Sequence, residues 1–181
     1  MISAQQLKDK IKNIAKGDSM KAQLLLRNYM MERFLARVSL SDYKDNFILK
    51  GGMLVSAVVG IQARATMDID TTVRALPLQV DETKSIVEKI ISIDAGDGVT
   101  FEIKKISDIM EEHDYPGIRI VLDAKLENLT QAIKVDMTWK AMLCLGHPPA
   151  AWVSVAPVSP PPLQLRLLPR LPLRLPSTAV V

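Results

Sequence analysis

Two aspartates, Asp68 and Asp70, stand two residues apart in the stretch RATMDIDTT, which otherwise alternates apolar and polar side chains. On a β-strand, residues i and i+2 share a face, so the two carboxylates would project together. Like charges side by side repel each other and are costly to desolvate, unless a cation lies between them. Paired carboxylates hold Mg²⁺, which can activate an attacking hydroxyl and stabilise a leaving pyrophosphate. Alone, the pair is weak evidence, because surface strands and loops often carry it.

A glycine pair precedes these aspartates, in the segment Lys50-Gly51-Gly52. We predict a turn there, followed by a buried helix over residues 53–59. A glycine turn at a helix N-terminus lets backbone N–H groups approach phosphate oxygens, and a neighbouring lysine could assist. The residues alone leave two alternatives open. The glycines could serve a tight turn that needs positive φ, and Lys50 could be solvated.

A third aspartate, Asp136, lies in the segment AIKVDMTW. Alternation at period 2 puts Asp136 on the polar face of a strand, with an apolar face behind it. If this strand lies beside the strand at about 67–73, Asp136 can complete a cluster of three carboxylates. Otherwise it is a solvent-facing aspartate. The polar face would hold Lys134, Asp136 and Thr138, and the apolar face Ile133, Val135 and Met137.

The elements that must position these residues follow from hydrophobic periodicity. Four helices are expected, and the first has Ser3 as its N-cap. A short strand precedes the glycine turn, the acidic strand follows the third helix, and three alternating strands come last. This order predicts an α+β (mixed α/β) domain with a mixed sheet and packed helices. The expected helices are 3–15, 19–38, 53–59 and 79–93, and the expected strands are 47–49, 67–73, 101–106, 117–126 and 132–139.

Composition limits the class of protein. Residues 1–139 contain 19 basic and 20 acidic residues, a net charge of −1, so the high isoelectric point of the whole chain is no argument for nucleic-acid binding. A single cysteine, Cys144, excludes an internal disulfide and fits a reducing compartment. No apolar run approaches the ~18 residues that a membrane span needs. We therefore expect a cytoplasmic protein that does not engage a membrane.

The chain changes character after Trp139. Residues 140–181 hold nine of the eleven prolines and no acidic residue, and they show neither helical nor strand periodicity. We expect this tail to be disordered or polyproline-like. The expected organisation is one domain over 1–139, with N-terminal helices in 1–44 and a core in 45–139, followed by the tail.

The order of these motifs resembles the nucleotidyltransferase superfold of DNA polymerase β-like enzymes. The segment FILKGGMLVSAVVGIQARATMDIDTTV is more closely similar to the AbiEii/AbiGii nucleotidyltransferase toxins of type IV toxin–antitoxin and phage-defence systems, over about residues 45–139. The resemblance implies transfer of a nucleotide from an NTP to a hydroxyl acceptor, in some members the 3′ end of tRNA, and a cognate antitoxin as partner.

The resemblance also implies roles for individual residues. Gly51 and Gly52, with Lys50, would hold the triphosphate, and Asp68 and Asp70 would bind Mg²⁺. The third catalytic carboxylate would be Asp136. Arg64 and Thr66 would orient the loop or contact phosphate, although a salt bridge and turn at the start of the strand explain them equally well.

The chain departs from the family after Trp139, where a Gly-Asp segment and a helical region with a further Lys and Asp are expected. If residues 140–143 are encoded AAG GCG ATG CTN, reading from the third base gives Gly-Asp-Ala. We therefore hypothesise a frameshift near Lys140, which the gene sequence tests. Two alternatives stay open: an inactive nucleotide-binding remnant, and an adaptor whose Pro-rich tail binds an SH3-like partner.

Overall fold

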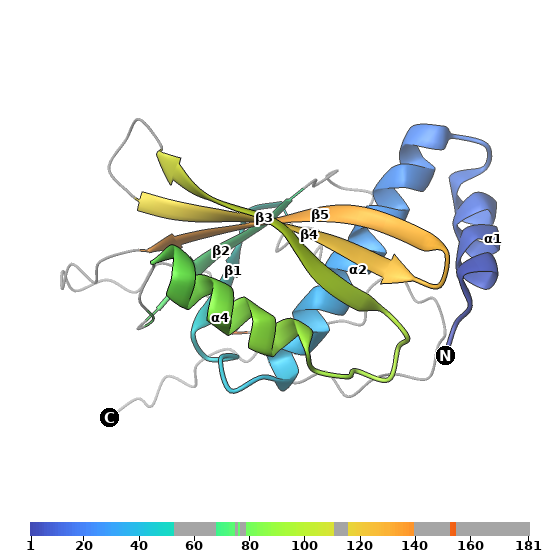
Figure 1. Cartoon of the computed structure of the whole chain (residues 1–181). Helices are drawn as coiled ribbons and strands as arrows, with labels where there is room; N and C mark the ends of the chain where they lie inside the picture. The colour runs from blue at the N-terminus through green and yellow to red at the C-terminus, as the bar shows by residue number, and fades with distance from the viewer. Residues whose placement is uncertain (53–67, 75, 77–78, 111–115, 140–152, 155–181) are drawn as a thin grey trace, which may run out of the picture.

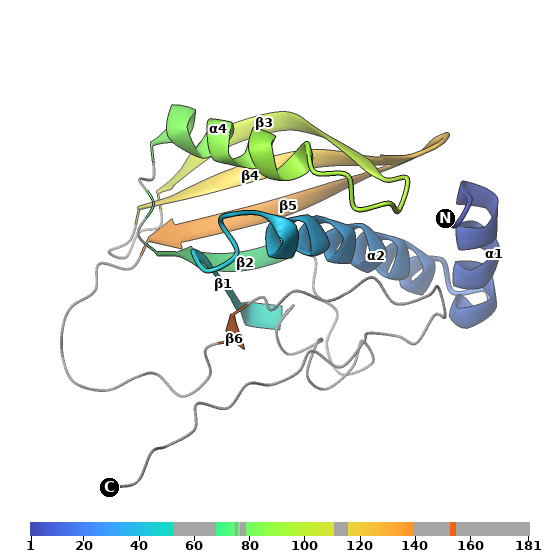
Figure 2. The same cartoon turned by 90° about the horizontal axis from the view of Figure 1, so that it is seen from below.

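The structure is a computed structural model, and it describes residues 1–52, 68–74, 76, 79–110, 116–139 and 153–154. Its centre is a six-stranded sheet with the strand order β3-β4-β5-β2-β1-β6. Helices α2 and α4 lie on the same side of this sheet (Figure 1), with α4 over β3 and β4 and α2 alongside β5 and β2 (Figure 2). The expected mixed α+β architecture is confirmed. The elements are α1 (Ala4–Ala15), α2 (Ser19–Leu40), β1 (Phe47–Lys50), β2 (Asp68–Val73), α4 (Val80–Ile91), β3 (Thr100–Met110), β4 (Pro116–Leu126), β5 (Leu129–Trp139) and β6 (Val153–Ser154).

The two N-terminal helices begin where the sequence predicts them. Ser3 caps α1 in a capping box, in which its side chain accepts from Gln6 N and the Gln6 side chain accepts from Ser3 N. Asp18 caps α2 by accepting from Lys21 N at 3.0 Å. Met30 and Met31 of this helix are fully buried and belong to the core.

The three last long strands form an antiparallel meander, and β5 then pairs with β2 in parallel. All three run further than their local alternation indicates, because pairing with neighbours extends them. In β3 the predicted strict alternation is wrong: the register shifts between Ile103 and Lys105. The register shift falls at Lys104 and Lys105, where two consecutive polar residues interrupt the alternation of the sequence.

The sheet has one apolar face and one polar face. The apolar face packs against α2 and α4, and Val87 and Ile90 of α4 are fully buried there. Ile86 and Ile91 of the same helix are partly buried against the same core. The predicted alternation in β5 is confirmed. The buried strand residues are Phe47, Leu49, Ile69, Val73, Ile118, Ile120, Leu122, Ile133, Val135 and Met137.

A buried ion pair ties α2 to the loop before β3. Arg37 is 1% exposed, and it donates to Asp97 Oδ2 at 3.0 Å from Nη1 and to Asp97 Oδ1 at 2.8 Å from Nη2. Its guanidinium also lies 4.9 Å from the ring centroid of Phe101. Helical periodicity gives no hint of this arginine, because a charged side chain is expected outside the core.

The expectation that the whole of 140–181 is disordered or polyproline-like needs one correction. Val153 and Ser154 form a short strand, β6, that pairs antiparallel with β1 at Leu49 and Ile48. An exposed edge of β1 has unpaired backbone groups, and two residues of suitable geometry satisfy some of them whatever their local pattern. The expected helix 53–59 and the remainder of 140–181 lie outside the described residues. Within the part of the chain that is described, no helix is long and apolar enough to cross a membrane.

Candidate active site

Four charged residues form a row across four neighbouring strands on the polar face of the sheet. Arg119 of β4 pairs in register with Asp136 of β5, Asp136 with Asp70 of β2, and Asp70 with Lys50 of β1. Directly opposed residues in a sheet project to the same face. The strand order therefore brings the predicted Lys50, Asp70 and Asp136 together, although they are far apart in the sequence.

Asp68 occupies the next position of β2 on the same face. Its register partner is Lys134 of β5, and Lys134 Nζ lies 4.0 Å from Asp68 Oδ1. Ile69 between the two aspartates is fully buried on the opposite face. Asp68 and Asp70 therefore lie on one face of β2, as the alternation predicts. Both aspartates are half-exposed.

Asp136 lies beside Asp70, because β2 and β5 are neighbours, as expected from the sequence. Its carboxylate, however, is already hydrogen-bonded to Arg119. Arg119 donates to it twice, from Nε to Oδ1 at 2.8 Å and from Nη2 to Oδ2 at 2.6 Å. Among the described residues, no three His, Cys, Asp or Glu side chains converge closely enough to hold a metal ion. In this structure Asp136 therefore does not complete the three-carboxylate cluster, because the arginine holds it.

Gly51 lies directly against Asp70. A Cβ built on Gly51 would stand 2.1 Å from Asp70 Oδ2, and the φ of Gly51 is 66°. Both facts favour glycine at this position, since a side chain would displace the Asp70 carboxylate and would strain the backbone. Gly51 and Gly52 open a helical segment immediately after β1. The glycine turn that the sequence predicts therefore forms one wall of the acidic site.

The electrostatics of the row follow from this crowding. Burial raises the pKa of Asp70 above its ordinary value, and the neighbouring charges of Asp136 and Asp68 raise it further, against the opposite effects of Lys50 and Arg119. The hydrogen bonds and charge of Asp136 raise the pKa of Arg119 above its ordinary value. A cation bound next to Asp70 would therefore stabilise its ionised carboxylate.

Two threonines connect the strands around this row. Lys50 Nζ donates to Thr138 Oγ1 at 2.9 Å, so the ammonium group reaches across β2 to β5. Buried Thr71 donates from Oγ1 to the backbone oxygen of Asp136 at 3.0 Å. These contacts fix the relative positions of β1, β2 and β5, which carry the acidic side chains.

Three further residues matter when the predicted site is compared with the structure. Arg64 and Thr66 lie outside the described residues. Arg119 is absent from the sequence-based predictions, although a signal for it exists. The β4–β5 hairpin closes between Leu126 and Leu129, and seven residues back from that turn on each strand are Arg119 and Asp136. Register counting from the short turn would have paired them.

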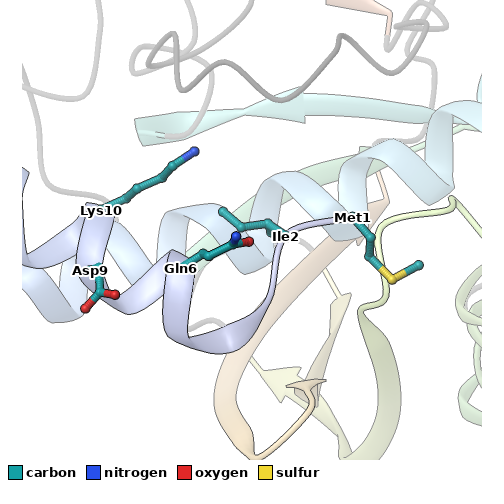
Figure 3. Close-up of a pocket in the computed structure, with 5 residues that line it drawn as sticks. All are labelled: Met1, Ile2, Gln6, Asp9 and Lys10. Atoms are coloured by element: carbon teal, nitrogen blue, oxygen red, sulfur yellow. The ribbon is translucent and has the colours of Figure 1, made fainter.

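Neither of the two hollows detected among the described residues lies at the acidic row. One, of about 320 Å³, is lined by Met1, Ile2, Gln6, Asp9 and Lys10, and Asp9 and Lys10 point away from each other there (Figure 3). The other, of about 430 Å³, lies between α1 and α2. The first hollow mixes apolar, polar and charged side chains, whereas the second is lined largely by apolar ones such as Ile11, Leu26 and Leu129.

A mixed sheet that presents paired aspartates beside a glycine turn is the arrangement that the resemblance to nucleotidyltransferases leads us to expect. Comparison with known families gives the particular family. The chain belongs to the AbiEii family, described as a nucleotidyl transferase AbiEii toxin of a type IV toxin–antitoxin system, whose model matches residues 33–170. This match extends past Trp139. The resemblance inferred from the glycine turn and the aspartate pair is confirmed.

Two solved structures from Helicobacter pylori are similar to part of this chain. The protein JHP933 is 17% identical with a TM-score of 0.42, and the match covers 65% of this chain and 44% of that one. A second protein, described as a presumed nucleotidyltransferase, is 18% identical with a TM-score of 0.39, and the match covers 64% of this chain and 45% of that one. The chain thus spans less than half the length of these two relatives. No curated protein matches it significantly.

Proposed function

We propose that this chain transfers a nucleotide from an NTP to a hydroxyl group on RNA, with Mg²⁺ held by Asp68 and Asp70. The observation that carries this proposal is the position of Gly51 against Asp70 Oδ2. Only a residue without a side chain leaves the approach to this carboxylate open, at the turn where a triphosphate would meet backbone N–H groups. In the type IV system, a cognate antitoxin would oppose the resulting toxicity.

The carboxylates fit the metal that the reaction needs. Mg²⁺ is commonly bound by one or two carboxylates, with substrate phosphates and water as its other ligands. Asp68 and Asp70 supply such a pair. The pKa of Asp70 is raised first by burial and then by its acidic neighbours, so a cation at this position would be favourable. When bound, the ion would stabilise charge on the attacking and leaving oxygens.

The residues of the chain do the positioning. The Gly51-Gly52 turn binds the triphosphate next to Asp70, and Lys50 adds positive charge between β1 and β5. Asp136, half-buried and held by Arg119, keeps a negative charge beside Asp70 and can orient the acceptor hydroxyl. Arg64 and Thr66 are further candidates for phosphate contacts.

A labelling experiment tests the proposal. The purified full chain is incubated with Mg²⁺, mixed tRNA and each of the four α-labelled NTPs in turn, and RNA-bound label is measured. Label should enter RNA with at least one NTP and should fall more than about a hundredfold in Asp70→Asn, because loss of outer-shell partners alone costs ~10–100-fold. Asp108→Asn, an exposed aspartate on β3, is the matched control and should retain activity. Absence of label with all four NTPs would contradict the proposal.

A second candidate, nucleotide binding without transfer, is favoured by one observation. The Arg119 pair occupies Asp136, and no third carboxylate joins Asp68 and Asp70 among the described residues. This candidate predicts that Mg²⁺ with a non-hydrolysable NTP raises the melting temperature while no label enters RNA. Stabilisation together with label transfer excludes it.

A further inference from the structure

Arg119 and the glycine turn lie on opposite sides of the two carboxylates of Asp136 and Asp70. Between the strand that carries Arg119 and the strand that leads into Gly51 lie the strands of Asp136 and Asp70. Neighbouring strands are ~4.8 Å apart, so the backbones of the two outer strands are separated by roughly 14 Å. The two flanks of the carboxylates are therefore different in chemistry: backbone amides at a glycine turn on one, and a guanidinium on the other.

The guanidinium of Arg119 is only partly used by the protein. Its Nε and Nη2 hold Asp136, while Nη1 has no hydrogen-bond partner in the part of the chain that the structure describes. The side chain is 42% exposed, against 14% for that of Asp136. An arginine fork held in place by one carboxylate keeps its remaining donors in a fixed direction, which suits recognition of a phosphate oxygen.

We propose that Arg119 is the acceptor-side contact of the enzyme, and that its Nη1 binds a backbone phosphate of the RNA close to the hydroxyl that receives the nucleotide. This inference rests on the proposed function, because that function puts the NTP at the glycine turn. Two anionic substrates must then share one face of the sheet. The flank of Arg119 is the one the triphosphate leaves open, and its single free guanidinium edge fits one phosphodiester.

The test separates this contact from the support of Asp136. Asp136→Asn is the reference, and Arg119→Gln is added to it, so that a neutral amide pair replaces the ion pair and no buried charge is left alone. Binding of a fluorescent single-stranded RNA with a free 3′-hydroxyl is measured by anisotropy at several salt concentrations. We expect the added substitution to weaken binding about tenfold and to lower the salt dependence by ~0.7, the value for one phosphate on a single strand.

Two controls accompany the measurement. Lys125→Gln, on the same strand and the same face but six residues away, should leave RNA binding unchanged. Nucleotide binding, read as thermal stabilisation by Mg²⁺ with a non-hydrolysable NTP, should be the same in the reference and in the double variant. Circular dichroism confirms that each variant folds.

The outcomes are distinct. Equal RNA binding in the reference and the double variant, or loss of NTP stabilisation with RNA binding retained, overturns the role of Arg119. If Arg119→Gln transfers label to RNA as fast as the unaltered chain, this inference alone is overturned. Arg119-dependent RNA binding without any transfer by the unaltered chain overturns the proposed function alone.

Discussion

Gly51 and Asp70 are in contact so close that no other residue could replace the glycine without movement. Its φ of 66° and the 2.1 Å between a built Cβ and Asp70 Oδ2 are two separate reasons for this. We expect Gly51→Ala to lower the free energy of unfolding by about 2 kcal/mol through strain and collision. It should also abolish nucleotide-dependent thermal stabilisation.

Gly96→Ala is the matched control for this prediction. Gly96 has nearly the same φ, 67°, but nothing lies within 4 Å of a built Cβ. It should therefore carry the backbone strain alone, about 1 kcal/mol, and leave nucleotide binding intact. If both variants lose equal stability and both bind nucleotide, the contact with Asp70 has no functional meaning.

Asp70→Asn should stabilise the protein while it removes activity. Asp70 faces Asp136 directly and has Asp68 beside it, so the neutral amide relieves repulsion worth about 0.5 kcal/mol. The raised pKa of Asp70 means that the folded chain binds more protons than the unfolded chain, so this cost grows as pH rises. Chemical denaturation in EDTA should show the gain at pH 7 and its loss near pH 3. A less stable variant at pH 7 would refute the repulsion.

Magnesium removal should be visible in stability as well as in activity. A ligand that binds only the folded chain stabilises it by about 2.7 kcal/mol at a hundred times its dissociation constant. We expect Mg²⁺ with a non-hydrolysable NTP to raise the melting temperature and EDTA to reverse the effect. Asp68→Asn should respond less than the unaltered chain, whereas Asp123→Asn, paired with Lys104 elsewhere on the sheet, should respond fully.

The Arg37–Asp97 pair should make the free energy of unfolding fall as the pH is lowered. Although burial acts to raise it, the pKa of Asp97 lies below its ordinary value because Arg37 and the backbone of Val99 donate hydrogen bonds to the carboxylate. This contribution is complete above the unfolded pKa and is lost as pH falls through the folded pKa. Asp97→Asn should cost about 3 kcal/mol at pH 7, since it leaves a buried arginine without its anion.

The control for Asp97 is Asp94→Asn in the same loop, where the exposed side chain accepts a hydrogen bond from Gly96 N. It should change stability by less than about 1 kcal/mol. Denaturation curves of the unaltered chain and Asp97→Asn should converge below pH 3. A constant difference at every pH would show that the Asp97 carboxylate is not ionised in the folded chain.

Local patterns predict the faces of strands well and their partners poorly. Alternation was enough to put Asp68 and Asp70 on one face and Asp136 on the polar side of its strand. The polarity of a side chain does not say which strand lies next to it, so Arg119 was missed, and Asp136 was expected in a cluster of three carboxylates and not at an arginine. The pairing of β2 with β5 is long-range, as is the contact of Arg37 with Asp97, and no local pattern indicates either of them. Arg119 and Asp136 pair across a short hairpin, and counting the register from its turn would have joined them.

The acidic row is assembled from chain segments of very different separation. Arg119 and Asp136 are 17 residues apart and meet across a hairpin with a two-residue turn, whereas the parallel pairing of β2 with β5 joins residues about 65 apart. Contacts of short separation close early in folding, and parallel ladders of long separation close late. We therefore expect Arg119 and Asp136 to pair before Asp70 joins them. A chain in which β2 has not yet paired with β5 would lack the neighbouring carboxylates on which the proposed site depends.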